Sequence, residues 1–497
     1  MTDNTSPRIR VRFAPSPTGL LHIGGLRTAL YNYLLARQKG GAFILRIEDT
    51  DRTRYVEEAE GDILDSLRWA GLDFDEGPGK EGAHTPYYQS QRSDLYKAYA
   101  QQLLDAGRAY YAFDTPEELA AMRERLTSPT NPAPRYDAVS RKGMKNALTL
   151  SPEEVKALMD EGVPHVVRLK VPEGETVRFH DQIRGDVAFK TSEIDDQVLL
   201  KSDGMPTYHL ANVVDDHLME VTHVIRGEEW LPSTPKHILL YQAFGWQPPQ
   251  MAHLPLILSP TGGKLSKRNA EKMGIPVSVR QYREAGYEPS ALINFLAMLG
   301  WNPGDEREVF QLPELTDAFS IERVGSSGVQ FNLDKLRWYN QQFLRLLPVE
   351  ALMDKARPLL AAEGFHPDEG YLRDVVELMQ DRISFAEELS TTCRFFYEDP
   401  TDYEERGVKK RWKDDSATLL LLYADQLEAL TNYDEASIEA TLRSIAESEG
   451  VGSGRLIHPA RLAVSGRSSG PSLFHMMAVL GRDTCIRRLR QAVGVLG

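Results

Sequence analysis

Two short stretches, far apart in the sequence, carry residue types suited to binding phosphate. The first is His22-Ile23-Gly24-Gly25, and the second is residues 262–268 (GGKLSKR). Glycines at a helix start leave backbone N–H groups open to an anion, which the helix dipole also favours. His22 adds a hydrogen-bond donor, and positive charge comes from Lys264, Lys267 and Arg268. Together the stretches predict a site that closes on a polyphosphate.

Each stretch alone is a weak signal. The four residues from His22 also suit an ordinary helix-start loop, and residues 262–268 also suit a solvated basic turn. The second stretch is not a Walker A loop, because Leu258 and Leu265 stand where that motif requires glycine and Ser or Thr. The prediction therefore depends on the two stretches meeting in the fold.

The elements around the first stretch are predicted by periodicity. Residues 9–13 alternate apolar and charged side chains, which indicates a strand. Apolar residues then recur at helical spacing from Leu26 until Gly40-Gly41, and residues 43–48 alternate again. Strand, helix and strand form a βαβ unit, which places ligands beyond the carboxyl ends of its parallel strands.

A polar stretch, residues 203–217, has two interpretations. It could supply metal ligands, although the spacing fits no standard helical motif; the candidates are His209, Asp215, Asp216, His217 and His223. Alternatively it is a helix on which Tyr208 and Asn212 share a face and offer polar groups to a small ligand. The next predicted strand ends in Arg226, whose guanidinium suits a carboxylate or a phosphate.

Composition narrows the class of protein. The 497 residues are 41% hydrophobic and 26% charged, which suits about three to five globular domains. Cys393 and Cys485 can form neither a disulfide framework nor a C-x-x-C zinc site, which favours a reducing, cytoplasmic setting. The first residues lack a signal-peptide core, and no stretch approaches about 18 apolar residues. We therefore expect neither secretion nor membrane insertion.

The charge is unevenly distributed. A net charge of −14 argues against indiscriminate nucleic-acid binding. However, residues 451–497 contain seven arginines and one aspartate, and residues 406–413 (RGVKKRWK) combine cations with a tryptophan. Basic patches on an acidic protein suit binding to one folded RNA. Ordinary arginines on helix faces explain them equally well.

Five spaced motifs, taken together, resemble those of the bacterial glutamyl-tRNA synthetases, which are class I aminoacyl-tRNA synthetases. They are RFAPSPTGLLHIGG (12–25), LRIEDTDR (45–52), PTYHLANVVDDH (206–217), VIRGEEW (224–230) and KLSKR (264–268). The first contains the family's HIGH signature with Gly25 in the fourth place, and the last matches its KMSKS signature. The departure at Gly25 removes a fourth-position histidine as an ATP contact. The resemblance spans nearly the whole chain.

The resemblance implies glutamate activation by ATP, followed by transfer to the terminal adenosine of a tRNA. Charge in the transition state would be opposed by His22, Lys264 and Lys267, with Mg²⁺ on the phosphates. The implied ATP-binding residues are Gly24, Gly25, Glu229, Trp230, Leu256, Ile257, Lys267 and Arg268. In the implied glutamate pocket, Arg12 and Arg226 face carboxylate and Glu48 faces the ammonium, completed by Ser16, Tyr208 and Asn212. Taken singly, each charged residue also suits an ordinary ion pair.

The predicted fold class is a multidomain α/β plus all-α chain. A Rossmann-type, doubly wound parallel sheet is expected to be split by an insertion, and followed by a stem-contact domain and a helical anticodon-binding region. Helical periodicity is clear in residues 375–389, 417–430 and 472–493. The predicted domains are 1–109 and 204–259 (catalytic), 110–203 (acceptor-binding), 260–346 (stem-contact, with the KLSKR loop), 347–405 and 406–497 (anticodon-binding).

Further expectations also come from the resemblance. Arg382 matches a family position that reads the last anticodon base, although a salt bridge on a helix surface explains it nearly as well. Some members hold zinc in the insertion, but Ala112 and Asp114 replace two of those cysteines, so we predict no zinc. The expected partners are ATP, L-glutamate and tRNA(Glu), and the chain is expected to be monomeric and cytoplasmic.

Two other functions stay open. One is a related enzyme, either a tRNA-independent glutamate transferase acting on a modified base or a small-molecule nucleotidylyltransferase; such enzymes usually lack a helical C-terminal half. The other is a non-catalytic RNA-binding paralogue. A paralogue is expected to have lost residues such as His22, Glu48, Arg226 or Lys267, and all four are present.

Overall fold

The structure is a computed structural model that describes residues 8–51, 53–265 and 267–497, with only the main chain of Lys267. The chain forms two compact units. Unit 1 comprises Met1–Ala285 and Leu292–Leu333, and unit 2 comprises Gly286–Ala291 and Asp334–Gly497. Helices α10 (Pro289–Met298) and α12 (Leu333–Leu346) include residues of both units.

Parallel strands form the centre of unit 1. Strand β1 (Arg10–Phe13) pairs in parallel with β2 (Ala42–Leu45), and β8 (His223–Gly227) pairs in parallel with β9 (Gln250–Leu254). Thr222, just before β8, donates its N–H to the Arg10 carbonyl and so brings the two pairs together. Strand β9 also meets β5 (Thr176–Asp181) in parallel. This arrangement confirms the predicted class I catalytic sheet.

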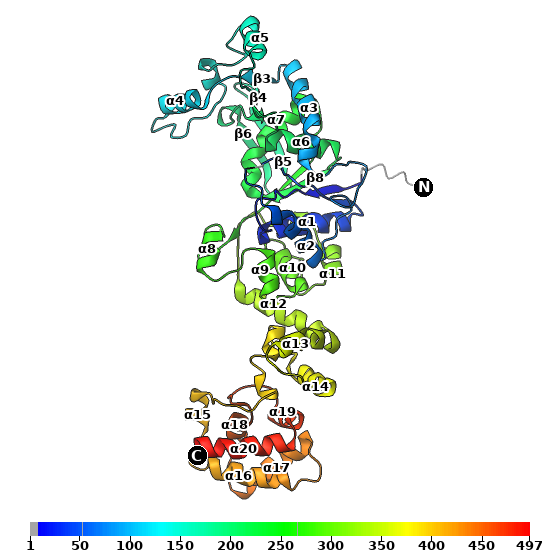
Figure 1. The fold of residues 1–497 in the computed structure, drawn as a ribbon, viewed down its shortest axis with the longest axis vertical. Helices are drawn as coiled ribbons and strands as arrows, with labels where there is room; N and C mark the ends of the chain where they lie inside the picture. The colour runs from blue at the N-terminus through cyan, green and yellow to red at the C-terminus, as the bar shows by residue number, and fades with distance from the viewer. Residues whose placement is uncertain (1–7, 52, 266) are drawn as a thin grey trace, which may run out of the picture. The chain divides into compact units, whose positions relative to one another are not determined.

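Helices cover this sheet, and their apolar faces explain why. Helix α1 (Ile23–Gln38) packs on β1, β2 and β8. A separate core cluster joins Ile44 and Val224 of the sheet to α3 (Ser93–Asp105), α6 (Tyr208–Leu218) and α7 (Thr234–Phe244). All four residues of β2 are buried, as expected of a parallel strand covered on both faces. Figure 1 shows α1 beside the first strands, in dark blue.

The predicted insertion contributes strands to two sheets. Strand β3 (Ala109–Ala112) pairs with β4 (Val166–Leu169), which pairs with β7 (Val198–Leu200), all antiparallel. Strand β5 forms an antiparallel hairpin with β6 (Gly185–Lys190), and this hairpin belongs to the four-stranded sheet with β9 and β8. Residues inside the predicted range 110–203 therefore extend the sheet that carries Arg226. The predicted domain boundaries themselves stay predictions.

The other elements of unit 1 connect or flank these sheets. They are α2 (Glu57–Trp69), α4 (Pro116–Leu126), α5 (Pro152–Asp160), α8 (Lys267–Lys272), α9 (Val279–Glu284), α11 (Leu312–Ala318), β10 (Ile257–Leu258), β11 (Val329–Gln330), and the 3₁₀ turns η1 (Gln89–Arg92), η2 (Ser140–Gly143), η3 (Thr191–Glu193), η4 (Glu228–Ser233) and η5 (Ile321–Arg323). Strand β10, which leads into the basic loop, pairs in parallel with β11.

Unit 2 is helical, as predicted. Its elements are α13 (Val349–Ala362), α14 (Glu369–Met379), η6 (Ala386–Leu389), η7 (Arg394–Phe396), α15 (Glu405–Arg411), α16 (Ser416–Glu428), α17 (Glu435–Ser448), α18 (Gly454–Ser465), α19 (Leu473–Leu480) and α20 (Arg482–Leu496). One apolar cluster runs through α13, α14 and α16–α20. The helical periodicity of residues 472–493 is interrupted at Gly481, whose φ of 82° is left-handed and ends α19.

Among the described residues, none of the helices is both long enough and apolar enough to span a bilayer.

Candidate active site

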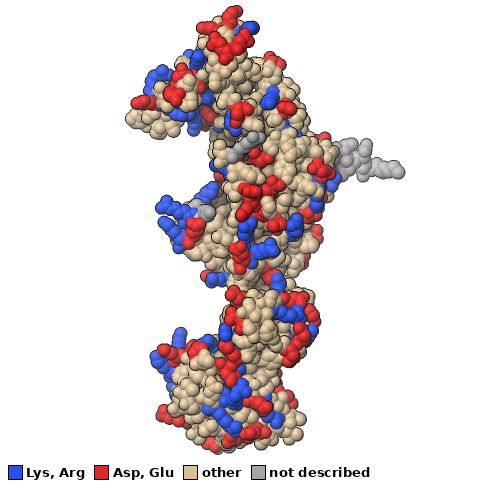
Figure 2. All heavy atoms as spheres, in the orientation of Figure 1, with Lys and Arg blue, Asp and Glu red and all other residues tan. Residues whose placement is uncertain are grey.

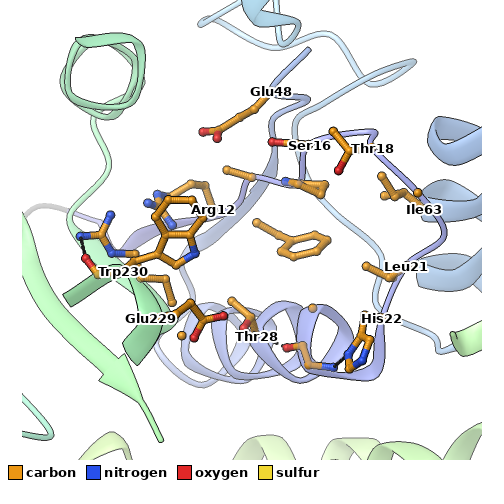
Figure 3. Close-up of a pocket in the computed structure, with 18 of the residues that line it drawn as sticks. Arg12, Ser16, Thr18, Leu21, His22, Thr28, Glu48, Ile63, Glu229 and Trp230 are labelled. Carbon is orange, nitrogen blue, oxygen red and sulfur yellow. Dashed lines mark hydrogen bonds between the residues drawn. The ribbon is translucent and has the colours of Figure 1, made fainter. Parts of the chain in front are cut away.

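One cavity of about 590 Å³ brings together residues from both halves of the catalytic sheet. It opens at the carboxyl ends of β1 and β8, where a parallel sheet places its ligands. Its lining includes most of the predicted site: Arg12, Ser16, His22, Gly24, Gly25, Glu48, Tyr208, Asn212, Arg226, Glu229 and Trp230. Figure 3 shows Arg12, Glu48 and Trp230 across the cavity from His22.

The turn at His22 starts α1, and backbone hydrogen bonds to residues far away in the sequence hold it in place. Ile23 donates its N–H to the Val277 carbonyl, and Val279 donates to the Leu21 carbonyl. The His22 side chain caps the helix, because its Nδ1 accepts from the Gly24 N–H at 3.0 Å. The neutral ring therefore carries its proton on Nε2. The Gly24 N–H is thus already bonded to His22. The Gly25 N–H is one of the first N–H groups of the helix, which have no acceptor within the helix, and it can therefore donate to a ligand.

His22 acts in the cavity as a neutral donor. Burial lowers the pKa of His22, and the positive charge of Lys264 lowers it further, while Glu229 opposes the shift. The ring is consequently uncharged at neutral pH. It can donate a hydrogen bond from Nε2, and the positive charge at this end comes from the basic loop.

At the end of the cavity opposite His22, a network of buried ion pairs supports Arg12. Arg12 Nε donates to Asp216 Oδ1 at 3.0 Å, and Arg46 Nη1 donates to the same oxygen at 2.8 Å. Burial pushes the pKa of Asp216 upward, but Arg12 and Arg46 together hold it below its usual value. Asp215 forms an ion pair with Arg92, whose Nε lies 2.7 Å from Asp215 Oδ1. Both aspartates are therefore ion-pair partners, which argues against the metal interpretation of residues 203–217.

Glu48 and Asn212 join this network. Arg46 Nη2 lies 3.3 Å from Glu48 Oε1, and burial raises the pKa of Glu48 although Arg46 and Arg12 lower it. The Asn212 amide satisfies its neighbours when its nitrogen faces Asp216 and its oxygen faces Arg46. Asn212 thus has partners in the network and also lines the cavity, and its predicted contact with a ligand stays a prediction. Arg12, by contrast, has no partner for its two terminal nitrogens among the described residues.

Arg226 is held on three sides. Its Nη1 donates to the Tyr208 hydroxyl at 2.7 Å, its Nη2 donates to Thr234 Oγ1 at 3.0 Å, and its Nε donates to His253 Nε2 at 3.1 Å. The side chain is 5% exposed and lines the cavity. Because Tyr208 accepts from Arg226, its own hydroxyl proton is available to another acceptor. The result is a fixed guanidinium beside a phenol donor.

Trp230 and Glu229 line the cavity after the end of β8. The Trp230 side chain is 41% exposed and packs against Tyr208, with ring centroids 4.5 Å apart. Glu229 folds back over Gly227, where an added Cβ would lie 2.2 Å from the Glu229 carboxylate. The exposed aromatic face of Trp230 suits a flat base such as adenine.

The basic loop lies beside this cavity. Among the described residues, Lys264, Arg268, Leu256 and Ile257 do not line it. The loop starts from β10, where Leu265 donates to the Ile257 carbonyl, and it turns at Gly262 and Gly263, whose φ values of 88° and 73° are left-handed. Figure 2 shows Lys and Arg gathered around α8. The side chain of Lys267 lies outside the described part of the structure.

Among the described residues, no group of three or more His, Cys, Asp or Glu side chains is arranged to hold a metal ion. Asp114, at one of the positions considered for zinc, accepts from the Tyr136 hydroxyl at 2.9 Å and from the Lys145 N–H at 2.7 Å.

Comparisons with known proteins agree with this geometry. The family described as "tRNA synthetases class I (E and Q), catalytic domain" matches residues 8–338. A glutamate–tRNA ligase of Phocaeicola vulgatus is 49% identical over 505 residues, covering 98% of this chain and 99% of its own. This chain belongs to the glutamate–tRNA ligases. The resemblance predicted from five motifs is thereby confirmed.

Further similar proteins support membership of the glutamate–tRNA ligases over the full length. One from Amoebophilus asiaticus is 48% identical and covers 98% of each chain. The crystal structure of a glutamate tRNA ligase from Elizabethkingia meningosepticum, in complex with its amino acid, has a TM-score of 0.93 at 41% identity and covers 99% of this chain and 100% of its own. A family described as "Anticodon binding domain" matches residues 351–493, which disfavours the shorter related enzymes.

In the helical half of the chain, Arg382 is exposed and has no acidic partner among the described residues. Its Nη1 donates to the Gly470 carbonyl at 3.3 Å, so the salt-bridge alternative is not supported. Arg461 lies nearby: burial and then the Arg382 charge lower its pKa. Within the described part of the chain, its buried Nη1 has no hydrogen-bond partner. The two guanidiniums therefore form a positive site to which no described acidic side chain supplies a counter-charge.

Most of the other arginines in residues 451–497 are paired. Acidic partners within salt-bridge distance are present for Arg455, Arg467, Arg487, Arg488 and Arg490. Arg488 is only 2% exposed and also donates to three backbone carbonyls. The excess of arginine in this segment therefore serves mainly to join helices, and ordinary structural roles explain more of it than RNA binding does.

Proposed function

We propose that this cavity activates L-glutamate with ATP to form glutamyl-adenylate, and then transfers the glutamyl group to the 3′-terminal adenosine of tRNA(Glu), releasing AMP and pyrophosphate. The proposal is supported above all by one convergence: His22, Arg226 and Glu48 line a single cavity. The relatives named as glutamate–tRNA ligases support the same reaction.

At the amino-acid end, charge selects the substrate. Arg12 and Arg226 are permanently charged donors that suit carboxylate groups, and Glu48 is the acidic side chain available to the ammonium. An uncharged amide in place of the side-chain carboxylate leaves a buried guanidinium unpaired, which is costly. Ser16 and Tyr208 complete the pocket with hydroxyl groups.

At the phosphate end, the α-carboxylate of glutamate attacks the α-phosphate of ATP, and pyrophosphate leaves. His22 donates from Nε2, the Gly25 N–H adds a backbone donor, and Lys264, Lys267 and Arg268 supply positive charge as the loop approaches. No protein nucleophile is required, because the substrate carboxylate itself attacks. Glu229, Trp230, Leu256 and Ile257 would hold the adenosine.

Mg²⁺ is expected to arrive on the phosphates of ATP, where it neutralises their charge. The carboxylates in the described lining are Glu48 and Glu229, and they form no group of metal ligands, which fits a metal carried by the nucleotide. Zinc is not expected. A monomeric chain that works in the cytoplasm stays our prediction.

In the helical half, Arg382 would contact the last anticodon base. Its exposed guanidinium, next to Arg461, suits an electron-rich base edge or a phosphate.

The direct test is aminoacylation with purified tRNA(Glu) and tRNA(Gln), using radiolabelled glutamate. ATP–pyrophosphate exchange is measured in parallel, with and without tRNA. We expect glutamate to be attached to tRNA(Glu) and glutamine to be rejected. Absence of glutamyl-tRNA(Glu) from a folded preparation would refute the proposal, and the tRNA(Gln) arm shows whether the enzyme discriminates between the two tRNAs.

A further inference from the structure

The turn between β5 and β6 reaches the back of the cavity. It comprises Asp181 to Gly185, and Asp181 is fully buried. This turn lies in the predicted acceptor-binding insertion, yet its hairpin belongs to the sheet that carries Arg226. Neither Asp181 nor the adjacent His253 of β9 lines the cavity. His253 therefore contacts Arg226 from outside the cavity, and Asp181 contacts His253.

Asp181 uses its two carboxylate oxygens differently. Oδ1 accepts three backbone N–H groups, from Ile183 at 3.0 Å, Arg184 at 2.9 Å and His253 at 3.3 Å. Oδ2 faces His253 Nδ1 at 2.6 Å. A carboxylate can only accept here, so Nδ1 of His253 carries the proton. The other ring nitrogen, Nε2, is then an acceptor.

That acceptor meets Arg226. His253 Nε2 lies 3.1 Å from Arg226 Nε and 3.2 Å from Thr234 Oγ1. Arg226 has no acceptor capacity, so this contact exists only while Nε2 lacks a proton. Asp181 thus decides, through the tautomer of His253, whether the guanidinium is attracted or repelled.

We propose that Asp181 and His253 are positioning residues that hold Arg226 Nε and so fix the orientation of the guanidinium toward the substrate carboxylate, which would replace the long contacts of Nη1 with His237 (3.5 Å) and of Nη2 with the Trp230 carbonyl (3.4 Å). This inference rests on the proposed glutamate-binding role of Arg226. The two side chains contact neither substrate nor ATP. Their effect is on the orientation of the guanidinium.

The surroundings agree with a neutral ring. His253 is fully buried, and burial lowers its pKa while Asp181 raises it; Arg226 and Arg184 lower it further. Burial raises the pKa of Asp181, but the contact with His253 and the backbone donors bring it below its usual value. The pair is therefore a carboxylate and a neutral imidazole at neutral pH.

The Asp181→Asn substitution tests the tautomer directly. The three backbone donors require the amide oxygen to take the place of Oδ1, so the amide NH₂ must face His253 Nδ1. The ring proton then moves to Nε2 and opposes the N–H of Arg226. We expect KM for glutamate to rise about tenfold, the loss of one charge-assisted hydrogen bond, with KM for ATP within about twofold of wild type.

The His253→Gln substitution provides the rescue. Its amide oxygen can accept from Arg226 without depending on a ring tautomer, so KM for glutamate should stay within about threefold of wild type, whereas His253→Leu should raise it about tenfold. In the double variant D181N/H253Q, the cost of D181N should largely disappear. A merely structural role for Asp181 predicts the same cost in both backgrounds.

A matched control lies on the same hairpin. Asp186 accepts from His180 Nδ1 at 2.8 Å, but both side chains are exposed, at 95% and 68%. Asp186→Asn should leave KM for glutamate unchanged, and circular-dichroism melting should verify folding of each variant. Equal KM values for D181N and D186N, or for H253Q and H253L, would overturn the inference. Each KM is compared with that of the wild-type enzyme. If the proposed function itself were wrong, the wild type would not charge tRNA(Glu), which is a different result.

Discussion

The two ends of the cavity are built in different ways. At the amino-acid end, Arg12, Arg226 and Glu48 lie on or next to strands and are fixed by buried ion pairs and hydrogen bonds. At the phosphate end, Lys264 and Arg268 flank the end of the basic loop, are exposed, and do not line the cavity. The first end is organised before substrate binds. The second requires the loop to approach.

This difference separates recognition from catalysis. A preorganised pocket discriminates because its buried charges remain unpaired when the wrong substrate enters. A cationic loop acts best if its contacts form as charge develops on the phosphates, since such contacts stabilise the transition state more than the ground state. Substitutions at the two ends should consequently change different kinetic constants.

The largest effect is expected for Arg226→Gln. Loss of the buried charge removes the carboxylate partner and disturbs Tyr208, so kcat/KM for glutamate should fall about 10³-fold. KM for ATP should change little. The measurement is tRNA aminoacylation at varied glutamate, with the exposed Arg178 of β5 as a matched Arg→Gln control. A fall of less than about tenfold would show that Arg226 does not bind the substrate carboxylate.

Lys267→Ala should act at the other end. Removing one cation from the transition state should lower the rate of ATP–pyrophosphate exchange about 10²-fold, or about 3 kcal/mol of barrier, while KM for glutamate is retained. Lys272, an exposed lysine at the end of α8, provides the control. A normal exchange rate in Lys267→Ala would refute the catalytic assignment.

Asp216→Asn tests how much the buried ion pairs of Arg12 and Arg46 contribute to the free energy of unfolding. The substitution leaves Arg12 and Arg46 without their shared carboxylate and should cost about 3 kcal/mol in the free energy of unfolding, measured in urea. Because the folded pKa of Asp216 is lowered, wild type should keep this advantage above the ordinary aspartate pKa and lose it as the pH falls toward the folded value. Asp425→Asn, in an exposed pair with Arg490, should leave the midpoint unchanged. Equal midpoints for both variants would contradict the account.

The smallest effect is expected for Gly24→Ala. An added Cβ would lie 3.4 Å from His22 Nδ1, at the limit of ordinary van der Waals contact with the capping ring, so KM for ATP should rise only about threefold. Gly61→Ala in α2 is the control, because its Cβ would meet nothing within 4 Å. An unchanged KM for ATP would mean that His22 is not tightly positioned.

Much of the site could be predicted because its residues lie at element ends. His22 at a helix start and Arg226 at a strand end follow from periodicity together with the parallel-sheet rule. The supporting layer could not be assigned. Arg46 alternates with apolar neighbours in a strand, but that pattern suits solvent exposure as well as burial, and its partner Asp216 lies far away in sequence.

Two further features required coordinates. The Asp181–His253 contact joins residues 72 positions apart, and neither belongs to a recognisable motif. The arginines of residues 451–497 indicated RNA binding as readily as helix packing, because sequence gives their number and not their partners. The structure pairs five of these seven with acids, whereas Arg461 and Arg482 have no acidic partner among the described residues.

The central claim is that one cavity holds the amino acid at a fixed, charged end and the nucleotide at an end completed by the loop. A crystal structure with a non-hydrolysable glutamyl-adenylate analogue tests this directly. The account predicts the side-chain carboxylate within hydrogen-bond distance of Arg226, the ammonium at Glu48, and the adenine beside Trp230. An analogue bound outside this cavity, or one whose side-chain carboxylate avoids both Arg226 and Arg12, would contradict it.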